Sequence, residues 1–187
     1  DGKVLKNARV ADDDTPMTLV NVMTPDQRLV EQIQVPVGTN EQAAAELVAS
    51  WAQAQGFHVV MDEAAPGRPN VVVTHAAGPG PRTLMFEGHT DVVTPGNVSQ
   101  WTYDPFGAQI VGRRMYGRGA NDTKGNLAAM LAAMAALKRS GVRLSGTVVG
   151  GVLCDEEDQM LGVQDFIRRG HADRITAAVI CEPQDGM

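Results

Sequence analysis

Runs of consecutive apolar residues alternate with stretches of helical spacing along the chain from residue 40 onward. Apolar runs of about four to eight residues, bounded by turn-forming residues, predict buried strands, because a strand covered on both faces lacks polar–apolar alternation. Such runs predict strands at 57–61, 70–75, 83–87, 146–153 and 177–181, and a hairpin-like stretch at 109–116.

Three further segments place apolar residues three and four positions apart, which is the spacing of one helix face. The first begins at Asn40, a residue suited to an N-cap, and Gly56 ends it. The second, 124–139, has the clearest apolar stripe, and the third covers about 160–169.

The N-terminal 39 residues give a weaker pattern. Mixed apolar spacing over 17–35 could hold a helix, but Pro25 and Pro36 interrupt it because proline lacks a backbone N–H. The acidic run 12–14 is expected to form a solvated turn, with a role in metal binding far less favoured.

Strands that alternate with helices indicate an α/β domain with a largely parallel, mixed and twisted sheet and helices on both of its faces. The 187 residues fit one domain and are enough to bury a substantial core. We therefore expect 1–187 to form one α/β unit, in which 1–39 is the least defined part.

The formal net charge of −6 and the pI near 5.1 argue against nucleic acid or an anionic membrane as a partner. No apolar stretch reaches the roughly 18 residues that a membrane span needs. Two cysteines, Cys154 and Cys181, do not make a disulfide framework, so we expect buried, reduced thiols and a cytoplasmic location. The alternative is that the two thiols approach each other, or a metal, at the strand ends.

Polar residues with metal-binding side chains follow four of the apolar runs. Ligands of open α/β sheets collect outside the carboxyl ends of the strands, where these residues would converge. One imidazole and several carboxylates at such an edge predict a site for a divalent metal ion. The candidates are His89, Asp91, Asp122, Asp155, Glu156, Glu157 and Glu182.

Each of these residues also has a simpler interpretation. His89 and Asp91 could be a hydrogen-bonded pair, and Asp122 could favour a helix start electrostatically. Neighbouring acids such as Glu156 and Glu157 are usually solvated. They follow a run that should be buried, however, and consecutive residues at a strand end point in opposite directions. One glutamate could then bind metal while the other faces the substrate and transfers protons.

Five stretches, taken together, resemble the M20 family of metallopeptidases. They are GHTDVV at 88–93, WTYDPF at 101–106, YGRGANDTKG at 116–125, DEE at 155–157 and CEP at 181–183. The family includes acetylornithine deacetylase, succinyl-diaminopimelate desuccinylase, aminoacylase and glutamate carboxypeptidase. The deacetylase and desuccinylase branch is the most similar.

The resemblance implies a role for each matching residue. His89 and Glu182 would bind one zinc ion and Glu157 a second, with Asp122 bridging the two. Asp91 would orient His89, and Glu156 would act as general base and then as general acid. Co²⁺ or Mn²⁺ could substitute for Zn²⁺. The sequence departs from the family pattern at Thr123, where methionine is frequent.

The resemblance also implies that the chain is the N-terminal part of a catalytic domain, with a lid and dimerisation domain and a last histidine ligand lying beyond it. His58, His75 and His171 match no motif and are expected to be surface or structural residues. The implied activity is zinc-dependent removal of an acyl group from an N-acylated amino acid by a homodimer. A dipeptidase or carboxypeptidase acting on short peptides is the alternative within the family. A metal-binding or interaction module without turnover is the alternative outside it.

Overall fold

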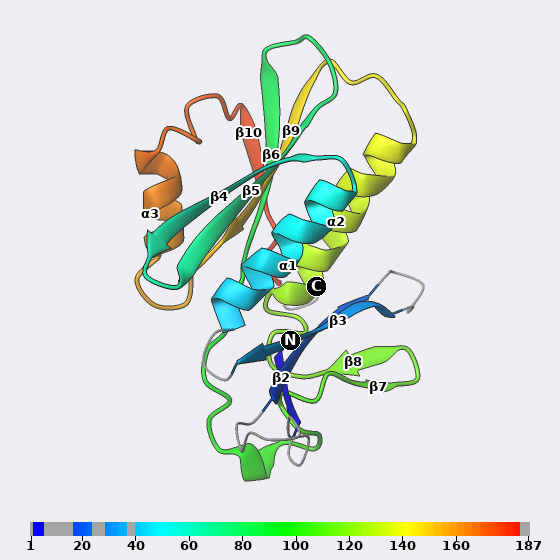
Figure 1. The fold of residues 1–187 in the computed structure, drawn as a ribbon, viewed down its shortest axis with the longest axis vertical. Helices are drawn as coiled ribbons and strands as arrows, with labels where there is room; N and C mark the ends of the chain where they lie inside the picture. The colour runs from blue at the N-terminus through cyan, green and yellow to red at the C-terminus, as the bar shows by residue number, and fades with distance from the viewer. Residues whose placement is uncertain (1, 6–16, 24–28, 37–39, 184–187) are drawn as a thin grey trace.

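The computed structural model describes residues 2–5, 17–23, 29–36 and 40–183 (Figure 1). The central element is a five-stranded sheet with the order β10-β6-β9-β5-β4. Its strands are β4 (His58–Ala65), β5 (Arg68–Ala76), β6 (Arg82–His89), β9 (Gly146–Leu153) and β10 (Ala177–Ile180). All five predicted strands are therefore present, although several extend beyond the predicted ends.

The predicted mixed sheet is confirmed, but its parallel share is smaller than expected. β6 pairs in parallel with both β9 and β10, whereas β5 pairs antiparallel with both β4 and β9. For β4 and β5 the reason is local, because they form a hairpin around Gly67, whose φ of 72° is readily adopted only by glycine. The parallel half of the sheet contains the three strands whose ends carry the candidate residues.

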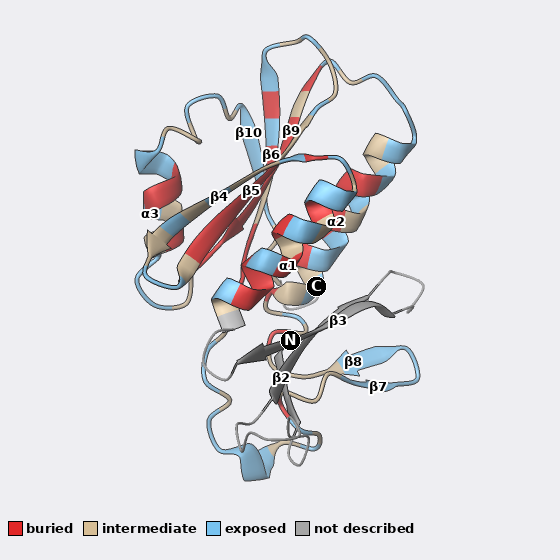
Figure 2. Cartoon of the chain, viewed as in Figure 1, coloured by how far each residue is buried: buried red, intermediate tan, exposed pale blue. Residues whose placement is uncertain are grey.

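Helices cover both faces of the sheet, as predicted. Two of them, α1 (Asn40–Ala54) and α2 (Lys124–Arg139), lie side by side on one face (Figure 1). Their buried side chains, including Leu127, Met130 and Met134 of α2, pack on the valines of β5 and β9. The third helix, α3 (Leu161–Arg168), covers the other face, where Phe166 packs with Met85 and other sheet residues. Figure 2 shows the buried residues on the inner sides of α1 and α2 and along the central strands.

The remaining elements lie outside this layered core. The hairpin of β7 (Gln109–Val111) and β8 (Arg114–Tyr116) is present as expected, and a short 3₁₀ helix covers Val98–Gln100. No helix among the described residues is both long and apolar enough to cross a membrane.

The helix considered for 17–35 is wrong. β1 (Gly2–Leu5), β2 (Met17–Met23) and β3 (Leu29–Pro36) instead form an antiparallel sheet in the order β1-β2-β3. β2 and β3 together are rich in Val, Leu and Ile, and the β-branched residues among them favour strands over helices. The acidic run 12–14 lies outside the described residues.

Both cysteines are free thiols, as expected. Cys154 is buried at 1% exposure, whereas Cys181 is only partly buried. Burial is the main cause that raises the pKa of the Cys154 thiol to about 11, and its Sγ lies 3.3 Å from the carbonyl oxygen of Arg68. The thiolate, which is the reactive form, is therefore scarce at neutral pH.

We predict that iodoacetamide at pH 7.5 labels Cys154 much more slowly than Cys181 in the native protein. The reason is that Cys154 is both less accessible and held as the neutral thiol. Mass spectrometry of the two cysteine-containing peptides measures both rates, and labelling in denaturant is the control that should equalise them. Equal labelling under native conditions would show that Cys154 is not buried in solution.

Candidate metal centre

The carboxyl ends of β10, β6 and β9 meet at one edge of the sheet, because these three strands are adjacent and parallel. His89 is the last residue of β6, Glu156 and Glu157 follow β9, and Glu182 follows β10. Asp122 reaches the same edge from the loop before α2, the helix that packs on β6 and β9. Segments far apart in sequence are thus brought to one place by strand order.

A tight turn before α2 places Asp122 at this edge of the sheet. The backbone N–H of Lys124 donates to the carbonyl oxygen of Gly119 at 2.9 Å, which folds the loop back just before the helix. Gly125 is required there, because a Cβ at this position would overlap the carbonyl oxygen of Ala120.

The imidazole of His89 is fully buried, and its two nitrogens have different surroundings. Nδ1 lies 3.1 Å from the carbonyl oxygen and 3.3 Å from Oδ1 of Asp91. Nε2 faces the other acids, at 3.1 Å from Oδ1 of Asp122, 3.4 Å from Oε1 of Glu182 and 3.8 Å from Oε2 of Glu156. An Nδ1–H that donates to Asp91 leaves Nε2 free to bind a cation, which is the usual arrangement of a metal-bound histidine.

Asp91 also holds the loop after β9 in place. The backbone N–H of Glu156 donates to its Oδ1 at 3.0 Å, and the N–H of Glu157 donates to its Oδ2 at 2.9 Å. Burial would raise the pKa of Asp91, but the hydrogen bonds from His89 and from these two N–H groups outweigh it and lower the pKa. One carboxylate therefore fixes both the imidazole and the two glutamates.

The electrostatic potential at the site is strongly negative. Burial alone would lower the pKa of His89, but the hydrogen bond with Asp91 and the charges of Asp91, Glu182 and Glu156 raise it to about 9. The pKa values of Glu157 and Glu182 are raised, first by burial and then by neighbouring acids, with Asp122 among them in both cases. Surroundings that favour a positive charge on the imidazole would also favour a cation among these side chains.

The donor set fits a divalent metal ion. His89, Asp122 and Glu182 offer one nitrogen and two oxygens that all lie within 4.8 Å of one another. Oε1 of Glu157 is buried and has no hydrogen-bond partner among the described residues, so it is available to a metal ion. One imidazole and several carboxylates match the ligands that zinc and similar ions take in catalytic sites.

The predicted residues do not all join one cluster. His89, Asp122 and Glu182 form the three-residue group, with Glu156 beside His89, whereas Glu157 stands outside that group. Asp155 turns away and forms an ion pair with Arg68. His171 bonds to Asp62 at 2.7 Å, which agrees with a structural role.

Two residues tie the start of α2 to the end of β10. The sequence marked Thr123 only as a departure from the family pattern, and it did not single out Asn126. The hydroxyl of Thr123, which is fully buried, donates to the carbonyl oxygen of Cys181 at 2.7 Å. The side-chain amide of Asn126 donates to the same oxygen at 2.7 Å. These bonds connect the backbone on either side of the site, next to Asp122 and Glu182. The unusual threonine was the available signal, but only the fold shows what its hydroxyl contacts.

The comparisons with known proteins agree with this arrangement. A sequence model described as peptidase family M20/M25/M40 matches residues 85–186. Succinyl-diaminopimelate desuccinylase of Methylocella silvestris is 38% identical over 128 residues, which are 67% of this chain and 32% of that protein. The enzyme of the same name from Methylorubrum populi is 36% identical over 154 residues, covering 78% of this chain and 36% of that protein.

Solved structures share the fold. Human carnosine dipeptidase 1 has a TM-score of 0.65 at 22% identity, over 77% of this chain and 33% of that chain. A Bacillus subtilis protein described as a dinuclear metal-binding M20 peptidase has a TM-score of 0.57 at 15% identity, over 75% of this chain and 36% of that chain.

The family match covers more than half of the sequence, so the chain belongs to peptidase family M20/M25/M40. It spans about a third of the length of these two curated relatives.

We predict that Thr123→Val weakens binding of a divalent metal ion, with zinc as the probe, and lowers the free energy of unfolding by about 0.5–1.5 kcal/mol, the typical contribution of one hydrogen bond. Valine keeps the shape of threonine but cannot donate to the Cys181 carbonyl. Urea unfolding and zinc titration measure the two effects. Thr123→Ser, which keeps the hydroxyl, is the control and should bind zinc nearly as the wild type does. Wild-type behaviour of the valine variant would mean that Asn126 alone holds this junction.

Proposed function

We propose that this chain is part of a zinc-dependent amidohydrolase that removes an acyl group from an N-acylated amino acid. The observation that carries the proposal is the convergence of His89 Nε2, Asp122 and Glu182 at the ends of parallel strands. Similarity to the succinyl-diaminopimelate desuccinylases supports an acyl-amino-acid substrate.

The family resemblance implies the role of each ligand, and the positions of the side chains support these roles. His89 and Glu182 would hold one zinc ion, Glu157 would hold a second, and Asp122 would serve both. The orphaned Oε1 of Glu157 and the influence of Asp122 on the pKa of Glu157 support a second ion on that side. Asp91 would keep His89 in the tautomer with Nδ1 protonated.

Bound zinc ions would supply Lewis-acid polarisation of the substrate carbonyl and would make an attacking water more acidic. Glu156 would take the proton from that water and return it to the departing amine. Its Oε2 lies 3.8 Å from His89 Nε2, beside the three-residue group but outside it, and its side chain is 35% exposed. It can therefore reach both the centre and an incoming substrate.

Further segments of a longer protein would complete the enzyme. The curated relatives are about three times as long as the aligned part of this chain, which leaves room for a lid that recognises the substrate and for another zinc ligand. We propose a cytoplasmic homodimer for the full-length protein. Peptide-bond cleavage is the alternative activity, and kinetics on acylated amino acids and on dipeptides would distinguish the two.

We predict that Glu156→Gln lowers kcat by about 10²–10⁴-fold, the usual contribution of a general acid–base group. The amide cannot accept the water proton, whereas the zinc ligands are untouched, so zinc content should stay near that of the wild type. Steady-state kinetics and elemental analysis measure both. Loss of zinc from this variant would show that Glu156 is a ligand rather than the base.

We also predict that Asp122→Ala weakens binding of both zinc ions, whereas Glu182→Ala weakens mainly one. Only a bridging carboxylate serves two ions at once. Calorimetric titration of the metal-free variants counts the sites that remain, and Asp158→Ala, an exposed acid in the loop after β9, is the control. Identical titrations for Asp122→Ala and Glu182→Ala would contradict the bridge.

A further inference from the structure

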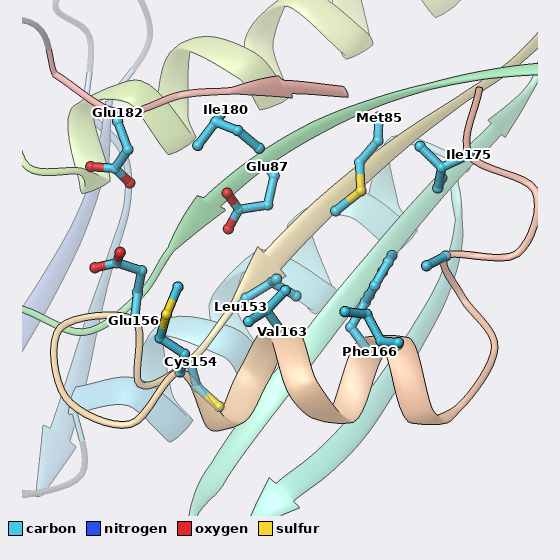
Figure 3. Close-up of a pocket in the computed structure, with 13 residues that line it drawn as sticks. Met85, Glu87, Leu153, Cys154, Glu156, Val163, Phe166, Ile175, Ile180 and Glu182 are labelled. Atoms are coloured by element: carbon cyan, nitrogen blue, oxygen red, sulfur yellow. The ribbon is translucent and has the colours of Figure 1, made fainter. Parts of the chain in front are cut away.

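An apolar pocket of about 370 Å³ lies between α3 and the sheet, directly beside the candidate metal centre (Figure 3). Its volume is within the range of small-molecule sites. Figure 3 shows the carboxylates of Glu156 and Glu182 at one end of the pocket and apolar side chains toward the other. These apolar walls include Met85, Leu153, Val163, Phe166 and Ile175.

A third carboxylate, that of Glu87, also lines the pocket. Side chains alternate along a strand, so Glu87 lies on the same face of β6 as Met85, which packs in the core beneath α3. Gly151 on the neighbouring strand leaves room for Met85, because a Cβ there would overlap its Cε, whereas the same Cβ would make only ordinary contact with Cγ of Glu87, at 3.8 Å. The sequence pattern did not identify Glu87 as a candidate, because Glu87 is the last residue of the apolar run that predicts a buried strand.

Glu87 has no evident structural partner. No cationic group or N–H donor among the described residues pairs with its carboxylate, and burial is the main cause that raises its pKa. It is absent from the group of His89, Asp122 and Glu182 that can hold one ion. A partly buried carboxylate between apolar walls is unfavourable unless it gains a partner, and the open pocket is where one can enter.

We propose that Glu87 is a specificity-determining residue that pairs with a cationic group on the substrate. The pocket would take an unbranched alkyl side chain along its apolar walls, with the terminal ammonium or guanidinium at Glu87. This assignment rests on the proposed function and names its substrate class as N-acylated amino acids with a basic side chain. A neutral side chain of equal length would fit the walls but leave Glu87 unpaired, so it would bind less well.

The test compares Nα-acetyl-lysine with Nα-acetyl-norleucine, which has the same side chain without the ammonium group. We expect the full-length, zinc-loaded protein to favour the lysine derivative by about tenfold or more in kcat/KM, as a charge-assisted hydrogen bond would give. Glu87→Gln should abolish most of this preference, mainly through a higher KM for the lysine derivative. Its kcat/KM for the norleucine derivative should stay within about twofold of the wild-type value. Glu46→Gln, on the exposed side of α1, is the matched control and should change neither.

Three outcomes would overturn the assignment. Equal losses on both substrates, or loss of zinc, would mean that Glu87 supports the metal centre. An unchanged preference would mean that the side chain binds elsewhere.

Binding of Nα-acetyl-lysine in a Glu156→Gln background separates this assignment from the proposed function, because it requires no turnover. Calorimetry should show affinity about tenfold weaker when Glu87→Gln is added, even if the protein hydrolyses neither substrate. Equal affinities would rule out the pairing, whereas binding without any hydrolysis by the wild type would count against the proposed function alone.

Discussion

Mutual repulsion of carboxylates around one buried imidazole is the constraint on which the site depends. Asp122, Glu182 and Glu156 all lie within 3.8 Å of His89 Nε2, and among the described residues the imidazole is the one group there that can carry a compensating positive charge. Burial lowers the pKa of His89, but the hydrogen bond and charge of Asp91, with the charges of Glu182 and Glu156, raise it to about 9. Burial, and then the charges of Asp122 and Glu156, raise the pKa of Glu182. A divalent cation removes this conflict, because it replaces repulsion between acids with attraction to a shared ion.

The fold holds these groups together by backbone connections as well as by strand order. Asp91 accepts two N–H groups from the loop after β9, which joins that loop to the end of β6. Thr123 and Asn126 both donate to the Cys181 carbonyl, which joins the start of α2 to the end of β10. Each connection involves backbone groups of or next to candidate ligands, so these hydrogen bonds help to position the ligands.

Much of this architecture was predictable because buried helices and strands have recognisable patterns of apolar residues in the sequence. The apolar stripe of 124–139 gave the bounds of α2, and the run 146–153 gave those of β9. Polar residues directly after such runs identified the edge where the candidates meet. Pairing direction is different, since it depends on connections that periodicity does not report. The antiparallel pairing of β4 and β5 was missed for that reason. The strands β2 and β3 were missed for another reason, because the mixed apolar spacing of 17–35 was given more weight than its strand-favouring residues.

Individual contacts were the least predictable level. Nothing in the sequence places the Thr123 hydroxyl on a carbonyl 58 residues away. Likewise, Glu87 was read as the end of a buried strand, and only the pocket beneath α3 reveals a carboxylate in apolar surroundings. Glu157 was predicted as a ligand, and that role stays a prediction because the described side chains leave it beside the three-residue group.

The central claim is that one imidazole nitrogen and carboxylate oxygens hold a zinc ion at the end of β6. Crystals of the zinc-loaded protein, with diffraction recorded on both sides of the zinc absorption edge, test it most directly. The account predicts an anomalous peak about 2.0–2.2 Å from Nε2 of His89 and from carboxylate oxygens of Asp122 and Glu182. A peak bound by Nδ1 of His89 or by the sulfur of Cys181, or the absence of zinc from this edge, would contradict it.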